Sequence, residues 1–243
     1  MASTLKTNAI EPEGATTNLV IGESGQNTVI SNNDIRANVL QDAGGNAVFT
    51  SNGSGVLSGV NSGFGSAMVL LSTQTASNSA SLSFTSGIDS TYKEYIFKFY
   101  NINPATDEAT FSFQVNATDG ADYNDSAITS TAIRAYHFEN DGNADMDNDP
   151  GADQAQGTAF QQLCEDVGNG ADESCAGELH LFNPASTVYV KHFMATVNFL
   201  QYEDRCYTHH VAGYINDTTA IDDIQFKMSS GNFDGKIKMW GVK

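Results

Sequence analysis

The sequence predicts an all-β protein, with a short-stranded N-terminal oligomeric stalk followed by an antiparallel β-sandwich head of jelly-roll-like type. Three observations lead to this fold class. Apolar and polar residues alternate with a period of two through residues 76–243, Gly, Asn, Asp and Ser separate the alternating segments, and segments suited to a helix are scarce. The one helix candidate is short and covers residues 158–163.

The alternating segments define the expected core of the head. Successive side chains of a strand point to opposite faces, so every second residue of a segment shares one face. The longest alternating segment covers residues 187–200. The residues expected on the inward faces are Leu82, Phe84, Tyr95, Phe97, Phe99, Phe111, Phe113, Val115, Leu179, Leu181, Tyr189, Lys191, Phe193, Ala195, Val197, Phe199, Ile224, Phe226, Met228, Ile237 and Met239.

Residues 1–75 are instead rich in Gly, Ser, Asn and Thr, and their apolar residues come in short runs, as at 18–22, 27–30, 47–50 and 55–57. Strands of about four residues bury too little surface to offset their own ordering entropy. We therefore expect several copies to wind together. Residues 1–17 are assigned as an N-terminal anchoring segment, 18–75 as a β-rich stalk with a hinge at 62–66, and 76–243 as the head.

The charge balance excludes several classes of function. Acidic residues outnumber basic ones 29 to 11, for a formal net charge of −18, so we expect no nucleic-acid partner. An anionic membrane or acidic polysaccharide would also be repelled unless a cation bridges the two. The apolar runs are far shorter than the roughly 20 residues of a membrane span, so we expect no membrane insertion. The first residues lack the apolar core of a signal peptide, which suggests synthesis in a cytoplasm.

The acidic segment 139–153 holds the candidate metal site. Asp145, Asp147 and Asp149 follow the alternate spacing of oxygen ligands in calcium loops. The match is incomplete, because Pro150 stands where such loops need Gly and no Glu occupies the twelfth position. Two hypotheses remain open: a calcium loop and a solvated acidic loop. No other cofactor is expected.

The three cysteines do not form a disulfide framework. Cys164 and Cys175 flank a Gly/Asp-rich turn, so a local disulfide stays open beside the free thiols expected in a reducing cytoplasm. Cys206, His209 and His210 suggest a metal at first sight, but neighbouring residues of a strand point to opposite faces and would not converge.

Catalytic signatures are absent from the sequence, and we expect no enzyme. The nucleophile elbow Gly-x-Ser-x-Gly does not occur, and residues 30–75 are too short for the β-helix that carries the acid pair of a tail depolymerase. Trp240, Tyr202, Tyr207 and Tyr214 are candidates for a sugar-stacking surface. Core or subunit-interface packing is the competing interpretation for Trp240.

Several stretches together resemble tail-fiber-like virion structural proteins of marine bacteriophages. These are residues 5–12 with 19–25, then 63–75, 102–107, 181–184 and 235–242. The resemblance covers most of the chain, and its motifs are structural rather than catalytic. It implies a virion component, commonly a trimer, that ends in a C-terminal β head.

These features lead to one functional hypothesis and one rival. The first is a phage virion structural protein, a homotrimeric tail fiber or tail-associated receptor-binding protein that mediates host attachment. The rival is a capsid decoration or head-fiber protein without receptor binding. The expected partners are other copies of the chain, other virion proteins through the N-terminus (a tail adaptor, a nozzle or the capsid), and a host surface receptor, for which a glycan is one candidate. Receptor contacts are expected on loops 116–126, 139–153 and 201–210.

Overall fold

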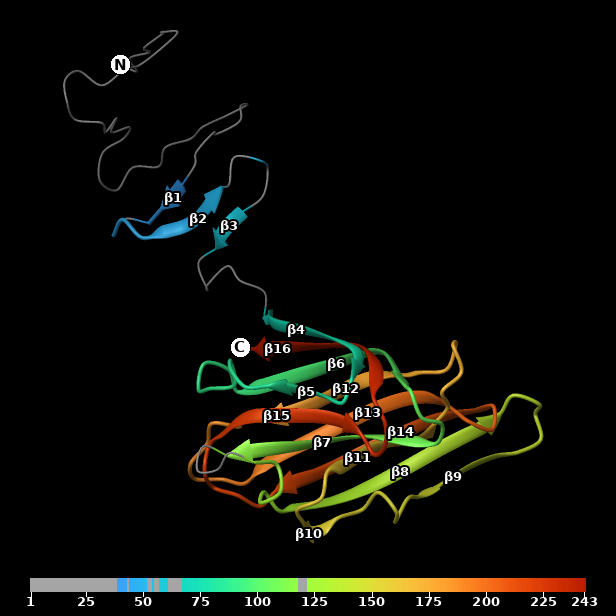
Figure 1. Ribbon diagram of the computed structural model, residues 1–243. Coiled ribbons are helices and arrows are strands. Elements are labelled where there is room, and N and C mark those ends of the chain that lie inside the picture. Colours follow the sequence, from blue (N-terminus) through green and yellow to red (C-terminus); the bar gives the residue numbers. More distant parts are fainter. Residues whose placement is uncertain (1–38, 43, 52–53, 55–56, 61–66, 118–121) are drawn as a thin grey trace, which may run out of the picture. The chain divides into compact units, whose positions relative to one another are not determined.

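The structure is a computed structural model that describes residues 39–42, 44–51, 54, 57–60, 67–117 and 122–243 (Figure 1). None of these residues is helical, and every pair of neighbouring strands is antiparallel, so the all-β prediction is confirmed. The chain divides into two compact units, Met1–Phe64 and Gly65–Lys243. The expected anchoring segment 1–17, the runs 18–22 and 27–30, and the hinge 62–66 all lie outside the described residues.

The first unit contains a small antiparallel sheet in the order β1-β2-β3, formed by β1 (Val39–Gln41), β2 (Ala47–Ser51) and β3 (Leu57–Val60). Asp42 shapes the turn between β1 and β2, because its Oδ1 accepts hydrogen bonds from the backbone N–H groups of Gly44 and Asn46 at 2.8 and 2.9 Å. The apolar side chains of Val39 and Leu40 are 42% and 45% exposed. This sheet therefore supplies little core of its own.

The second unit is one large antiparallel sheet that is nearly closed into a barrel-like shape. Its main path runs β4-β16-β6-β12-β13-β11-β7-β15-β5, and β14 pairs with both β13 and β8, which in turn pairs with β9 and β10. The strands are β4 (Met68–Ser79), β5 (Ser81–Phe84), β6 (Glu94–Pro104), β7 (Ala109–Ala117), β8 (Ile128–Phe138), β9 (Ala144–Asn148), β10 (Ala155–Gly157), β11 (Gln161–Val167), β12 (Cys175–Phe182), β13 (Lys191–Gln201), β14 (Arg205–Ile215), β15 (Ile221–Met228) and β16 (Phe233–Val242).

Aromatic side chains fill the space that the sheet encloses. Phe226 of β15 is fully buried at the centre of this core. Its ring lies 5.4 to 6.4 Å, centroid to centroid, from five other phenylalanine rings on β5, β6 and β7: Phe84, Phe97, Phe99, Phe111 and Phe113. Such aromatic pairs add stability beyond the area that they bury. The inward faces predicted from the alternation are confirmed for β6, β7, β13 and β15.

Three expectations about the segments differ from the structure. Tyr189, expected on the inward face of the run 187–200, lies before β13 and is 70% exposed, because the strand begins only at Lys191. The boundary expected at residue 76 falls inside β4, which pairs with β16 from Met68 onward, so the compact unit begins before residue 76. The helix expected at 158–163 is wrong, because Gln161–Val167 forms β11. Two register shifts in its pairing with β7 break the alternation, and the buried Gln161 places a polar side chain inside.

Replacement of Phe226 by Ala should lower the free energy of unfolding by about 3–5 kcal/mol, because the cavity would open at the contact point of five rings. Urea denaturation of the full chain followed by tryptophan fluorescence and circular dichroism measures this change. Tyr189→Ala is the matched control, since Tyr189 is 70% exposed and its loss should change stability by less than about 0.5 kcal/mol. Equal effects of the two substitutions would contradict the described core.

Candidate functional site

The candidate site lies on the outward face of β4, β16, β6 and β12. The alternation that turns Phe97 and Phe99 of β6 into the core leaves Lys98 and Tyr100 on the other side of the strand. On β16, the buried Ile237 in the same way leaves Lys236 and Lys238 outside. Two short alternating stretches thus place three lysines and a tyrosine on one face.

The register between neighbouring strands makes these side chains direct cross-strand neighbours. Lys238 stands opposite Lys98, and Lys236 stands opposite Tyr100. Like charges directly opposite each other on neighbouring strands are destabilising. Glu178 of β12 offsets part of this cost, since its Oε2 lies 3.0 Å from Lys98 Nζ. The hydrogen bond from Lys98, followed by one from His180, holds the pKa of Glu178 below its ordinary value.

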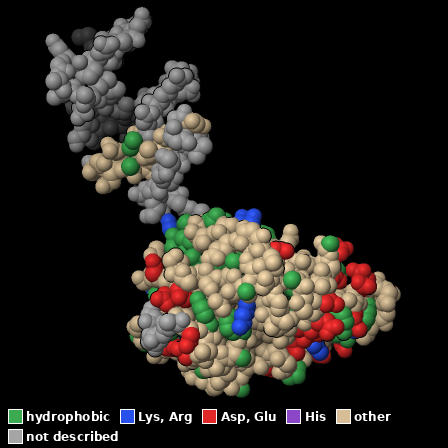
Figure 2. Space-filling model, viewed as in Figure 1, with side chains coloured by type: hydrophobic (Ala, Val, Ile, Leu, Met, Phe, Trp, Pro, Cys, Tyr) green, Lys and Arg blue, Asp and Glu red, His purple; other side chains and the backbone are tan. Residues whose placement is uncertain are grey.

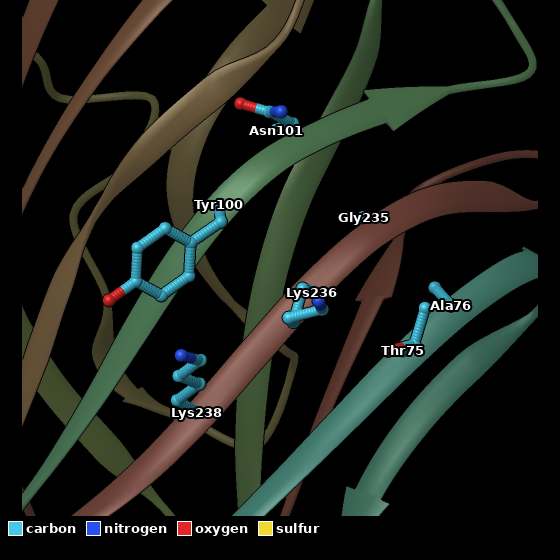
Figure 3. A pocket seen from close by; sticks show the side chains of 7 residues that line it. All are labelled: Thr75, Ala76, Tyr100, Asn101, Gly235, Lys236 and Lys238. Carbon is cyan, nitrogen blue, oxygen red and sulfur yellow. The ribbon is translucent and has the colours of Figure 1, made fainter.

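A hollow of about 400 Å³ opens between β4, β16 and β6 (Figure 3). Its lining residues are Thr75, Ala76, Tyr100, Asn101, Gly235, Lys236 and Lys238. The Tyr100 ring is 41% exposed, and Lys238 reaches toward it, with Nζ 5.4 Å from the ring centroid. The hollow therefore combines an accessible aromatic ring with two cations and the hydroxyl and amide groups of Thr75 and Asn101.

Backbone irregularities create the hollow. β16 shifts register between Phe233 and Gly235 against β4, and between Asp234 and Lys236 against β6. Asn101 has a φ of 50° and Gly235 a φ of 137°. A Cβ atom at position 235 would lie 2.7 Å from the carbonyl oxygen of Asn101, so only glycine fits there. Bulges of this kind redirect side chains and are frequent beside functional sites.

Two further hollows continue along the same face. One of about 350 Å³ shares Tyr100 with the first and extends over Lys98 and Glu178 to Thr196. Another of about 170 Å³ shares Thr196 and extends to His180, Phe182 and Met194. The shared residues make the three hollows neighbours across β16, β6, β12 and β13.

His180 links two carboxylates at the β12 end of this face. Its Nδ1 lies 2.6 Å from Glu94 Oε1 and its Nε2 lies 3.2 Å from Glu178 Oε1. Partial burial disfavours the charged imidazole, but the hydrogen bonds to Glu94 and Glu178 outweigh this effect and raise the pKa of His180 above its ordinary value. The cationic form of His180 is therefore stabilised in the folded protein.

The contribution of His180 to stability should depend on pH. A raised pKa in the folded state adds stability that is complete below the unfolded value of about 6.5 and is lost as the pH rises through the folded value. His180→Gln should therefore lower the melting temperature more at about pH 5.5 than at about pH 8.5. His192→Gln is the control, because the exposed His192 contacts the Tyr214 ring and pairs with no carboxylate among the described residues. A pH-independent effect of His180→Gln would contradict the pairing.

Two of the three candidate calcium ligands, Asp145 and Asp147, lie in a strand, and Asp149 directly follows it. Residues 144–148 form β9, which pairs with β8 and sets Asp147 opposite Arg134. Asp145 is exposed, Asp147 Oδ1 accepts a hydrogen bond from Arg134 Nε at 2.9 Å, and Asp149 is buried. Among the residues that the structure describes, no group of three or more His, Cys, Asp or Glu side chains is arranged to hold a metal ion.

Arg134 lies against two carboxylates of the acidic segment, Asp147 and Asp149, which the linear sequence does not show. Its Nη1 lies 2.6 Å from Glu165 Oε1 and 3.8 Å from Asp149 Oδ1. The hydrogen bond to Asp147, followed by the one to Glu165 and the charge of Asp149, holds the pKa of Arg134 above its ordinary value. Asp149 Oδ2 also lies 3.1 Å from Nε2 of the buried His209, whose Nδ1 faces the Leu163 carbonyl oxygen at 3.0 Å. Asp149 Oδ2 and His209 Nε2, both buried, do not form a hydrogen bond with each other. The cluster ties β8 and β9 to β11 and β14.

Calcium should accordingly leave the melting temperature unchanged when excess calcium is compared with chelator at matched ionic strength. Asp147 and Asp149 already face the same cation, Arg134, and a metal ion bound by both would have to displace its guanidinium. A bound ion at 100 times its dissociation constant would add about 2.7 kcal/mol of stability. A rise in melting temperature that Asp145→Asn abolishes would contradict this expectation and support the calcium loop.

The remaining candidates are dispersed. Cys164 and Cys175 are buried free thiols on neighbouring parts of β11 and β12, and burial, followed by the Cys164 thiol, raises the pKa of Cys175. On β14, Cys206 and His210 are exposed while His209 is buried on the opposite face. Tyr207 is buried between the rings of Tyr136 and Phe199, Tyr202 is exposed, and Trp240 and Tyr214 are half-buried.

Residues Lys98, Tyr100, Lys236 and Lys238 were not among the candidates from the sequence. The signal was present in the stretch Lys236-Ile237-Lys238, where a buried central residue implies that both lysines face outward. The pairing of β16 with β6 could not be inferred, because the partners are far apart in the chain: Lys238 and Lys98 are separated by 140 positions (238 − 98). The net charge of −18 also predicted an acidic surface rather than a cluster of lysines.

Comparisons of the chain with protein-family models, with curated proteins and with solved structures find no match. Within the described part of the chain, no helix has the length and apolar character needed to cross a bilayer. A functional proposal therefore depends on the sequence and on the geometry of the face formed by β4, β16, β6 and β12.

Proposed function

We propose that this chain is a phage virion structural protein, a trimeric tail fiber or tail-associated receptor-binding protein that mediates host attachment. The observation that carries this proposal is the hollowed outward face of β4, β16, β6 and β12, where an exposed aromatic ring and cations stand on a rigid sheet. Recognition sites on rigid scaffolds commonly combine a few placed polar groups with an apolar platform. The resemblance of the chain to tail-fiber-like proteins points in the same direction.

The compact unit serves in this proposal as a jelly-roll-like β-sandwich head. Contacts across the core support two facing layers, since Phe84 of β5 contacts Phe97 of β6 and Phe113 of β7 contacts Phe193 of β13. The layer containing β5, β15, β7 and β11 would then face the layer containing β4, β16, β6, β12 and β13. The outward face of the second layer would carry the recognition site, in place of the loops 116–126, 139–153 and 201–210 expected from the sequence.

The first unit serves in this proposal as part of an interleaved trimeric stalk. Its three strands leave Val39 and Leu40 exposed, and a sheet of this size needs further apolar cover for independent stability. Winding with two other copies would bury these side chains. Light scattering of the full chain should give three times the mass of 25.9 kDa, and a monomer would contradict the stalk.

Competition for adsorption tests the attachment function. Purified full-length chain, added at saturation to host cells before infection, should reduce the fraction of phage that adsorbs, while a second virion protein of the same phage should not. Antibodies against the chain should label the tail in electron micrographs. Absence of competition together with labelling of the capsid would overturn the proposal in favour of a capsid decoration or head-fiber protein.

A further inference from the structure

The cations of the compact unit are concentrated on two neighbouring strands. The chain has 11 Lys and Arg residues, of which Lys6 and Arg36 lie outside the described residues. Five of the other nine lie on β6 and β16 or directly beside their ends: Lys93, Lys98, Lys236, Lys238 and Lys243. In a chain of net charge −18, this places a basic patch on one face. We use the name basic patch for Lys98, Lys236 and Lys238.

The four other cations are engaged within the fold. Arg134 binds Asp147 and Glu165, as described above. Lys191 is fully buried and donates to the carbonyl oxygens of Asp217 and Thr219. Arg205 lies over the Phe138 ring at 4.2 Å, and Lys227 lies over the Phe160 ring at 3.9 Å. The basic patch differs from these four in position, because its three lysines stand side by side on the outward face of β6 and β16, although Lys98 also pairs with Glu178 and Lys238 lies over the Tyr100 ring.

Three carboxylates on the same strands and on β12 are engaged as well. Glu94 lies against His180, Glu178 is shared by Lys98 and His180, and Asp234 Oδ1 accepts the backbone N–H of Asn78 at 2.7 Å. Among the described residues, no carboxylate forms an ion pair with Lys236 or Lys238. Two uncompensated cations therefore line a hollow next to an exposed tyrosine ring.

The basic patch contains a like-charge repulsion that Glu178 offsets only in part. Lys238 faces Lys98 directly across β16 and β6, and like charges in this position repel each other. An anionic group in the hollow would lie close to both Lys236 and Lys238 and would relieve this repulsion. Tyr100 offers the flat apolar face of its ring beside that position, while Thr75 and Asn101 offer polar groups (Figure 3).

We propose that the hollow between β4, β16 and β6 binds an acidic saccharide through Lys236, Lys238 and Tyr100. A sugar ring presents an apolar face that stacks on an aromatic side chain, and its carboxylate or sulfate groups pair with the lysines. Two lysines beside one aromatic ring match an anion carried on a sugar. A nucleic acid would instead need a longer basic track with repeated stacking positions.

The acidic remainder of the surface does not prevent this binding. Many Asp and Glu side chains gather at the end of the compact unit where β8 and β9 lie (Figure 2). In sheet order, β9 is five strands from β6, about 24 Å at about 4.8 Å per strand. The Debye length at physiological salt is about 8 Å, so these charges are largely screened at the hollow. An acidic saccharide thus becomes a partner that the net charge alone had disfavoured.

An acidic saccharide would be the class of receptor recognised in the proposed host attachment, and this inference rests on that proposed function to that extent. Its test uses only purified components. Titration calorimetry of the full-length chain would compare a sulfated galactan oligomer, the same oligomer after desulfation, an oligouronate of matched length and an oligothymidylate. We expect binding of at least one acidic saccharide, with the sulfated and carboxylated probes showing which anion is preferred, and none of the desulfated oligomer.

Three substitutions locate the site. Lys236→Met and Lys238→Met together should weaken binding of the acidic saccharide about tenfold, as expected for two exposed charge pairs. Tyr100→Ala should weaken it through loss of stacking. Lys227→Met is the matched control, because it removes a lysine from β15 and should leave the affinity unchanged. Loss of Lys238 relieves repulsion with Lys98, so Lys238→Met should not lower the melting temperature, and weakened binding would not come from unfolding.

Each contrary outcome overturns the assignment. Absence of binding by both acidic saccharides does so, as does binding that the Lys236→Met, Lys238→Met variant leaves unchanged. If the chain binds oligothymidylate with equal affinity and the same variant loses this binding, the hollow binds polyanions in general and not an acidic saccharide in particular. These results are independent of adsorption to cells, so saccharide binding without competition for phage adsorption would count against the attachment function alone.

Discussion

The compact unit depends on the burial of one face of its long strands around the aromatic cluster centred on Phe226. This ring contacts phenylalanines from β5, β6 and β7, and it joins strands that are far apart in the sheet order. Because a strand alternates its side chains, this demand fixes the orientation of the outward residues as well. Ile237 has to face inward, and Lys236 and Lys238 consequently face outward. The position of the basic patch is therefore a result of core packing.

Curvature of the sheet accounts for the hollow beside the basic patch. A sheet that nearly closes on itself must bend, and β16 bends where its register shifts against both β4 and β6. The left-handed backbone of Asn101 and the conformation of Gly235 fall at that bend. The hollow beside Tyr100 lies at the same place, so the deformation that lets the sheet curve also opens the surface. A regular strand pair would present a flat face there.

The sequence predicted the features that depend on local pattern, and it missed those that depend on distant pairing. The inward residues of β13 follow directly from alternation, and each of them from Lys191 to Phe199 is buried. β11 was mistaken for a helix because bulges interrupt its alternation and the buried Gln161 finds its partners, the carbonyl oxygens of Ala152 and Gln162, only in the folded chain. Residues 144–148 of the acidic segment were expected in a loop. Their pairing with β8, where Asp147 meets Arg134, depends on tertiary structure that the local sequence does not reveal.

The distribution of charge shows why composition alone is a poor guide to partners of this protein. The net charge of −18 is a sum over the whole chain, whereas a ligand responds to charges within about one Debye length. At the β8–β9 end, Arg134 offsets Asp147 and Glu165, and it serves to hold β9 onto the sheet. At the β6–β16 face the balance is reversed, since the carboxylates are the groups already engaged and two lysines remain uncompensated. The same folding that hides the cation of the acidic segment thus exposes the cations of the hollow, and the local sign of the surface at that hollow is opposite to the sign of the chain.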